Sequence, residues 1–243
     1  MPDNPSFIEN AKNKIMAYAT IYKSIFVEYE YLVCSEAFVY NNYYIIDAKP
    51  DNYPHLTGVN LLISAQDFFD KCCDGTLEES DFDLKKKGKS EKDVKGSVKR
   101  KVSVLPDAMK VFDDSFLVEE NFIKNSVSCN IATSDNRFTL GFIDVGKSRP
   151  MTLLKGNELD LSKAKKISLL LRKHISKEKF DELIIGNDKT LIEYYDLIKD
   201  LIEPSLIMRE DKTIDNNEVK TVSSDESLIE SIELEIDNSE EPA

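Results

Sequence analysis

The feature that most constrains the fold is a series of strand-like segments between residues 116 and 154. Phe138, Leu140 and Phe142 alternate with Thr139, Gly141 and Ile143, which is the two-residue period of a strand with one buried face. The Ser134-Asp135-Asn136 segment that precedes them is typical of a hairpin turn. Four segments therefore predict a meander of antiparallel strands: 116–118, 126–133, 137–144 and 151–154.

Helices are predicted before and after these strands. Ser6 can cap a helix whose apolar residues recur at spacings of three and four as far as Tyr22. A second helix begins after Ser64 and ends at Gly75. The other expected strands lie near 29–33 and 38–46, with a short strand at 78–84. Two further helices are expected, one from Val98, which tolerates Pro106 only near its first turn or as a break, and one over 191–202. Residues 25–30 could be helical, and 167–171 could be strand or helix.

Together these patterns predict an α+β fold in which an antiparallel sheet packs against N-terminal and central helices. The chain has 243 residues, of which 41% are hydrophobic, enough for one core. Composition then shifts past Pro204 to Asp, Glu, Asn and Ser. We therefore predict one domain over residues 1–203 and a disordered acidic tail over 204–243.

The formal net charge of −13 is concentrated in that tail. From Glu203 to Ala243 there are thirteen acidic and three basic residues, a balance of −10, which leaves −3 for the rest. Lys85 to Lys110 holds ten basic residues against three acidic ones. Such a region on a nearly neutral body is compatible with phosphate binding, although charge alone slightly favours a solvated lysine-rich loop. Residues 85–97 are predicted to form a mobile basic loop.

The tail also suggests a protein partner. Residues 228–236 alternate acidic and aliphatic side chains, so this segment could become ordered on another protein. An acidic tail could instead lie over a basic site of its own molecule and compete with phosphate. The sequence leaves both alternatives open.

The four cysteines predict neither a disulfide framework nor a metal centre. Cys72 and Cys73 are adjacent, and no Cys-x-x-Cys or His/Cys pair has the spacing of zinc ligands. We expect buried, reduced thiols and no metal or cofactor. The chain has no run of 18 apolar residues and no signal-peptide core, so we expect no membrane association and a cytoplasmic location, in the host cell if a phage delivers it.

The first candidate for chemistry is the turn Tyr53-Pro54-His55-Leu56-Thr57-Gly58. Histidine is the side chain best suited to proton transfer near neutral pH. The other histidine, His174, follows an apolar run and two basic residues, a setting typical of a plain surface role. A structural role for His55, hydrogen-bonded to backbone in its turn, is an equally good interpretation at this stage.

The second candidate is the segment 146–154, in which Lys147 and Arg149 flank Ser148. The planar fork of arginine suits a phosphate, and a hydroxyl adds a neutral donor; Thr152 would project from the strand that follows. Basic residues beside a hairpin also serve solubility, which is the simpler explanation for this segment alone. With His55, however, the segment could complete a metal-free ribonuclease site, because such a site needs an acid, a base and cations around the phosphate.

The order of these segments along the chain is similar to that of a known protein family. The YPHLTGV turn, the helix DFFDKCCDGTLEESDF, and the later TLGF and RPMTLL segments resemble the phage-associated nucleases of the barnase/EndoU/colicin/RelE-like superfamily, in its fourth phage subgroup. The resemblance covers roughly residues 7 to 175. It implies a barnase/RelE-like fold, RNA cleavage without metal, and catalytic roles for His55, Arg149 and Thr152, with Thr57 as a further candidate. The expected substrate-binding residues are Lys147, Ser148, Lys99, Arg100 and Lys101.

The sequence supports two alternative functions. The first is an RNA endonuclease, phage-linked or toxin-like, that cleaves through the 2′-hydroxyl, with transfer RNA among its candidate substrates. The alternative is a non-catalytic RNA- or protein-binding module of a phage or mobile element, including a structural role in which His55 merely closes a turn. The mechanism requires that His55 and Arg149 lie close together, and opposite faces of the sheet would exclude it.

Overall fold

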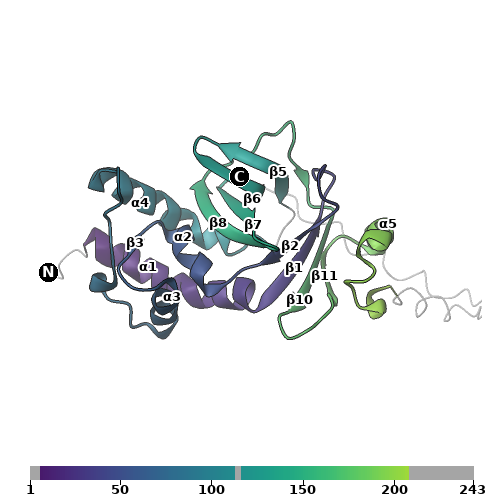
Figure 1. The fold of residues 1–243 in the computed structure, drawn as a ribbon, viewed down its shortest axis with the longest axis horizontal. Coiled ribbons are helices and arrows are strands. Elements are labelled where there is room, and N and C mark those ends of the chain that lie inside the picture. The colour runs from purple at the N-terminus through teal and green to yellow at the C-terminus, as the bar shows by residue number, and fades with distance from the viewer. Residues whose placement is uncertain (1–5, 113–115, 208–243) are drawn as a thin grey trace, which may run out of the picture. The chain divides into compact units, whose positions relative to one another are not determined.

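The computed structural model describes residues 6–112 and 116–207, which form a large, curled, mixed β-sheet with helices on two sides (Figure 1). The helices are α1 (Phe7–Tyr22), α2 (Tyr53–Thr57), α3 (Ala65–Asp74), α4 (Glu91–Ala108) and α5 (Asp188–Ile198), with a π-helical turn at Lys23–Val27 and 3₁₀ turns at Pro50–Asn52, Glu79–Asp81 and Pro204–Leu206. The strands are β1 (Tyr29–Cys34), β2 (Tyr44–Asp47), β3 (Asn60–Leu61), β4 (Phe82–Asp83), β5 (Leu117–Lys124), β6 (Val127–Ser134), β7 (Phe138–Asp144), β8 (Ser148–Lys155), β9 (Lys165–Lys166), β10 (Leu169–His174) and β11 (Glu182–Ile185).

The main sheet has the strand order β11-β10-β1-β2-β8-β7-β6-β5-β9, and β3 and β4 form a separate pair. The predicted meander is confirmed for β5 to β8, which pair antiparallel in chain order. The prediction of a wholly antiparallel sheet is wrong, because β2 and β8 pair in parallel. A parallel pair needs a long crossover connection, and here the chain between the two strands includes α2, α3, α4 and three strands of the meander.

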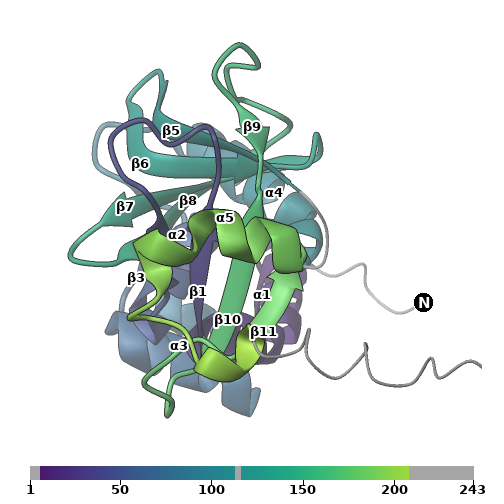
Figure 2. The same cartoon turned by 90° about the vertical axis from the view of Figure 1, so that its right-hand side faces the viewer.

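The curl of the sheet brings its two ends together. β9 pairs with β5 and β10 pairs with β1, yet only two residues separate β9 from β10 in the chain. The linking residues bond to both sides, since Ile167 N–H donates to the Phe116 carbonyl at 3.1 Å and Ser168 N–H donates to the Cys34 carbonyl at 2.9 Å. Figure 2 shows β9 leading directly into β10, which lies beside β1.

The largest core lies between the inner face of the sheet and the helices α1 to α4 (Figure 1). Tyr31 of β1 stacks on Phe112 with ring centroids 3.7 Å apart, and Leu140 is fully buried. Two smaller clusters lie on the outer face. One joins α5 to Leu32 and Leu171, and the other contains Phe122, Cys129, Ala132, Leu159 and Ala164. The sheet is therefore buried on both faces along much of its length.

Helices α1 and α3 begin and end where the sequence predicts. The Ser6 hydroxyl oxygen accepts from Glu9 N–H at 3.1 Å, and the Ser64 hydroxyl oxygen accepts from Asp67 N–H at 3.0 Å. Gly75 ends α3 with a φ of +71°. These caps are local in sequence, which explains why the pattern alone located them.

The predicted basic loop at 85–97 is wrong from residue 91 onward, because α4 begins at Glu91. The Ser90 hydroxyl oxygen caps this helix by accepting from Asp93 N–H at 3.2 Å. Val94 and Val98 are buried and extend the apolar face of the helix toward its N-terminus. Pro106 lies inside α4 near its end, so of the two settings that the sequence allowed, the first turn is excluded.

The predicted strand at 38–46 is also shorter than expected, since only Tyr44–Asp47 pairs as β2. The buried carboxylate of Glu120 accepts from the backbone N–H groups of Val39, Tyr40 and Asn41. These groups are therefore used by a side chain that lies 79 to 81 residues away in the sequence. No local pattern could have shown that competition.

The domain boundary predicted at residue 203 is too early. Pro204–Leu206 forms a 3₁₀ turn, and Leu206 packs with α5 at 2% exposure. The acidic tail beyond residue 207, which the sequence predicts to be disordered, lies outside the described part of the chain.

None of the helices in residues 6–112 and 116–207 is long and apolar enough to cross a membrane. All four cysteines are free thiols, and three of them are buried.

Candidate active site

The histidine of the predicted turn is carried by α2, a helix of a single turn. Pro54 favours the start of a helix, and Gly58 ends it in the left-handed region with a φ of +83°. Tyr53 and Leu56 are fully buried, whereas the side chain of His55 is exposed. The helix is thus fixed on its apolar side and presents His55 on the other.

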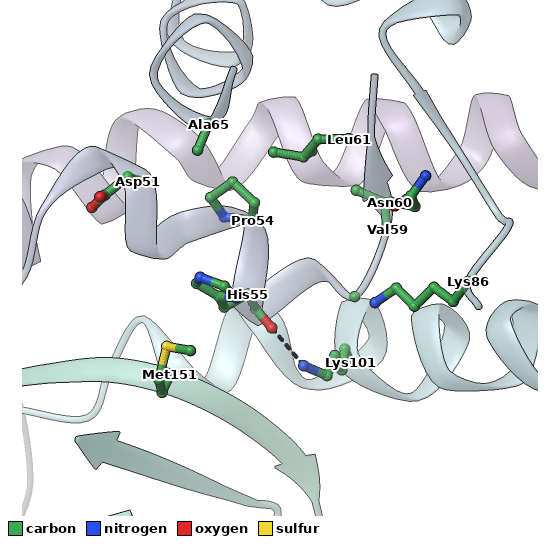
Figure 3. Close-up of a pocket in the computed structure, with 11 residues that line it drawn as sticks. Asp51, Pro54, His55, Val59, Asn60, Leu61, Ala65, Lys86, Lys101 and Met151 are labelled. Carbon is green, nitrogen blue, oxygen red and sulfur yellow. Dashed lines mark hydrogen bonds between the residues drawn. The ribbon is translucent and has the colours of Figure 1, made fainter. Parts of the chain in front are cut away.

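His55 lies at the edge of an open pocket with a volume of about 330 Å³ (Figure 3). Figure 3 shows Lys86 reaching toward the pocket from one side and Met151 of β8 lying below His55. The segments that form the pocket are α2, β3, the start of α3, the residues after β4, α4 and β8. Its lining residues are Asp51, Pro54, His55, Gly58, Val59, Asn60, Leu61, Ala65, Lys86, Lys101 and Met151.

Lys101 fixes α4 to the histidine turn. Its ammonium group donates a hydrogen bond of 2.5 Å to the backbone carbonyl of His55. Its methylene chain passes over Gly58, where an added Cβ would lie 2.9 Å from the Lys101 Cδ atom. Glycine at position 58 therefore serves two needs, the positive φ and the close approach of this lysine.

The pocket disfavours positive charge. Desolvation of the imidazole by the pocket lowers the pKa of His55 below its usual value of 6.5, although part of the side chain is exposed; Lys101 lowers the pKa further, while Asp51 acts in the opposite sense. Burial lowers the pKa of Lys101 to about 8, with further contributions from Lys86 and Lys89. The pKa of Lys86 is lowered for the same reasons, burial first and then Lys89.

Two chemical properties follow from these shifts. At pH 7 the imidazole of His55 is mostly neutral and can accept a proton. Lys101 is mostly protonated, yet it gives up its proton more readily than an ordinary lysine. An anion bound between Lys86 and Lys101 would relieve their mutual repulsion, so the pocket is suited to phosphate.

The other predicted residues of α2 and α4 have different placements. Thr57 is fully buried, and its hydroxyl donates to the Pro54 carbonyl at 2.8 Å, so it stabilises the turn instead of facing the pocket. Lys99 and Arg100 are exposed on α4. Only Lys101 of this basic trio lines the pocket.

The strand register separates Arg149 and Thr152 from His55. Residues directly opposite each other in an antiparallel pair share a face of the sheet. Arg149 lies opposite Ile143, which packs against the outer cluster that contains Cys129. Thr152 lies opposite Gly141, where an added Cβ would be 2.8 Å from Thr152 Cγ2 and 2.5 Å from Cys129 Sγ.

Both side chains therefore project from the outer face, whereas α2 packs with the inner one. A register shift between Gly141 and Phe142 produces this arrangement, because it adds an unpaired residue, Met151, to β8. Met151 lines the pocket in place of Arg149. The predicted site shared by His55 and Arg149 is not formed.

The remaining residues of that segment are also engaged elsewhere. Lys147 forms an ion pair of 2.5 Å with Glu30 of β1. Ser148 is buried, and its hydroxyl finds no hydrogen-bond partner among the described residues. Neither of them lines the His55 pocket.

Most of the pocket residues were not predicted as site residues from the sequence, and Asn60, Lys86 and Met151 are among them. Lys86 was counted in the basic stretch but was interpreted as part of a loop. Met151 lies in the RPMTLL segment, of which only polar residues were considered as site candidates.

His174 lies at the end of β10, with its Nδ1 atom 2.7 Å from the Ser176 hydroxyl. Within the described ranges no group of three or more His, Cys, Asp and Glu side chains could hold a metal ion.

Comparison with known proteins gives one result. A family model described as phage-Barnase-EndoU-ColicinE5/D-RelE like nuclease4 matches residues 14–233, which is most of the chain. Neither the curated proteins nor the solved structures contain a significant match. The barnase/RelE-like fold implied by the resemblance therefore remains a prediction.

Proposed function

The chain belongs to the phage-Barnase-EndoU-ColicinE5/D-RelE like nuclease family, and from this premise we propose that the His55 pocket is the active centre of a metal-independent endoribonuclease. One observation carries the proposal. A proton acceptor, His55, and two cations, Lys86 and Lys101, line the same pocket. These are the groups that cleavage through the 2′-hydroxyl requires.

In the proposed reaction, His55 accepts one proton from the substrate and Lys101 donates one proton to it. The neutral His55 ring takes the proton of the 2′-hydroxyl, and the 2′-oxygen attacks phosphorus. The bond from phosphorus to the 5′-oxygen breaks, and the Lys101 ammonium donates a proton to that oxygen. The products are a 2′,3′-cyclic phosphate and a 5′-hydroxyl.

Charge stabilisation in this scheme comes from Lys86 and Lys101. The pentavalent phosphate carries more negative charge than the ground state, so cations within the pocket bind it more strongly. Arg149 and Thr152 take no part, because they project from the outer face of the sheet. Lys99 and Arg100 are exposed on the helix that carries Lys101, where they can contact flanking phosphates.

The substrate in this proposal is RNA, and the setting is that of a phage-linked effector in the cytoplasm of a host cell. Two features support it: the family membership, and a basic helix, α4, beside the pocket. The pocket itself contains no feature that singles out transfer RNA.

Cleavage of an end-labelled RNA in EDTA tests the proposal. We expect products with 2′,3′-cyclic phosphate ends, and a loss of rate of about 100-fold or more in His55→Ala and in Lys101→Met. Arg149→Ala is the matched control and should stay within about threefold of the wild type. Thermal unfolding of each variant confirms that it is folded.

Two outcomes would overturn the assignment. Cleavage that stops in EDTA and returns with a divalent cation would exclude the metal-independent reaction. Full activity in His55→Ala would place the chemistry elsewhere. Saturable RNA binding without cleavage, in EDTA or in Mg²⁺, would favour the alternative of a non-catalytic binding module.

A further inference from the structure

The pocket has apolar lining residues that the proton-transfer scheme does not use. They are Pro54, Val59, Leu61, Ala65 and Met151. The volume of the pocket is about 330 Å³, which lies at the lower end of the range of small-ligand sites. A pocket lined by both cations and apolar side chains fits a nucleotide, because the phosphate prefers the cations and the flat face of a base prefers the apolar side chains.

One polar side chain, Asn60, lines this region from β3. Its Nδ2 donates a hydrogen bond of 2.8 Å to Asp83 Oδ1 on the paired strand β4. The same Asp83 oxygen accepts from the backbone N–H of Lys85 at 2.9 Å. Hydrogen bonding to Lys85 N–H, and then to Asn60, lowers the pKa of Asp83, so this carboxyl group is ionised at neutral pH.

An ionised carboxylate only accepts hydrogen bonds, so the amide of Asn60 must turn its nitrogen toward Asp83. Figure 3 shows that nitrogen directed away from His55. The opposite end of the amide, the Oδ1 atom, is an acceptor. The bond to Asp83 uses one of the two N–H donors of Asn60 and fixes the orientation of its amide, so the acceptor Oδ1 lies on the side away from Asp83, where it can contact a base.

We propose that Asn60, held by Asp83, is the specificity-determining residue of the pocket and accepts a hydrogen bond from an N–H group on the edge of the nucleobase at the cleavage site. This inference rests on the proposed nuclease function. It adds that the enzyme distinguishes bases by the position of a donor, while Pro54, Leu61 and Met151 contact the face of any base. A base whose edge presents a carbonyl or ring nitrogen at that position is disfavoured, because two acceptors would face each other.

The test uses DNA oligonucleotides that contain a single ribonucleotide whose base is A, C, G, U or absent. For the wild type we expect kcat/KM for the best base to exceed that of the worst by about 10-fold or more. In Asn60→Ala the four rates should become equal to within about threefold, and the abasic rate should not change. Asn42→Ala, an exposed asparagine on the β1–β2 loop, is the matched control and should keep the wild-type ratios.

A second pair of changes separates recognition from folding. An analogue of the preferred base that lacks the donor N–H should lose about 10-fold in the wild type and nothing further in Asn60→Ala, because both changes remove the same hydrogen bond. In Asp83→Asn the amide of Asn60 is free to turn, so the order of base preference should change while cleavage continues.

The two proposals fail in different ways. Equal base ratios in the wild type and Asn60→Ala would overturn the role of Asn60 and leave the nuclease function standing. No cleavage of any RNA would overturn the nuclease function. In that case NMR titration with the four 3′-nucleoside monophosphates tests the role of Asn60. The proposed role is overturned if the four nucleotides bind with equal affinity, or if Asn60→Ala leaves the four affinities unchanged.

Discussion

His55 and Lys101 have shifted pKa values that predict a specific pH dependence of cleavage. In the proposed mechanism His55 must be neutral to accept a proton, and its pKa lies below 6.5, so kcat/KM should rise with pH through that lower value and then level off. Lys101 must be protonated to donate, and its pKa is about 8, so kcat/KM should fall above that pH. We expect a bell-shaped profile with its maximum near neutral pH.

Lys101→Arg provides the control for the alkaline limb of that profile. Arginine keeps its proton throughout the accessible pH range, so the fall above pH 8 should disappear even if the maximal rate is lower. A profile for the wild type that is flat from pH 5 to 9 would contradict both assignments.

At the scale of one element, α2 depends on the left-handed conformation of Gly58. Gly58→Ala should lower the free energy of unfolding by about 1–2 kcal/mol, because alanine is strained at a φ of +83° and its Cβ meets the Lys101 side chain. The same change should lower kcat/KM, since Lys101 must shift away from His55. Chemical denaturation and cleavage assays measure the two effects.

Gly75→Ala is the matched control for this prediction. Gly75 ends α3 with a φ of +71°, yet an added Cβ there meets no atom within 4 Å. It should lose about 1 kcal/mol of stability and keep its activity. Equal losses of activity in the two variants would show that the contact of Lys101 with Gly58 does not matter for the chemistry.

At the scale of the whole molecule, the structure includes residues 204–207 in the folded body. Leu206 packs with α5 and β10, so Leu206→Ala should lower the free energy of unfolding by about 2–4 kcal/mol. The neighbouring Ser205 is exposed, and Ser205→Ala should change it by less than about 0.5 kcal/mol. Equal stabilities of the two variants would restore the boundary that composition predicts at residue 203.

Much of the fold could be predicted because its signals are local. The caps of α1 and α3 and the hairpins of β5 to β8 each depend on residues within a few positions of one another. The elements that were predicted wrongly depend instead on residues that are distant in the sequence. Glu120 shortens β2 from a distance of about 80 residues, and Val94 extends α4 only because a core exists for it to enter.

The candidate site shows the same division. The presence of His55 in the candidate site was predictable from the rarity of histidine and from the turn around this residue. The position of Arg149 was not predictable, because one unpaired residue in β8 places Arg149 and Met151 on opposite faces of the sheet, although residues two positions apart in a regular strand share a face. A strand shift of one residue reverses every side chain beyond it, and sequence patterns locate a strand less accurately than that.

By itself, the sequence determined the α+β class and the phage-associated nuclease family, and it led to the proposal of His55 as a site residue. Only the tertiary structure decided that Lys101, Lys86 and Asn60 line the same pocket as His55, while Arg149 projects from the outer face of the sheet. The reason is physical. Composition and periodicity specify which face of an element is buried, whereas the meeting of two distant side chains depends on register, crossover and curl of the sheet, which the whole chain sets together.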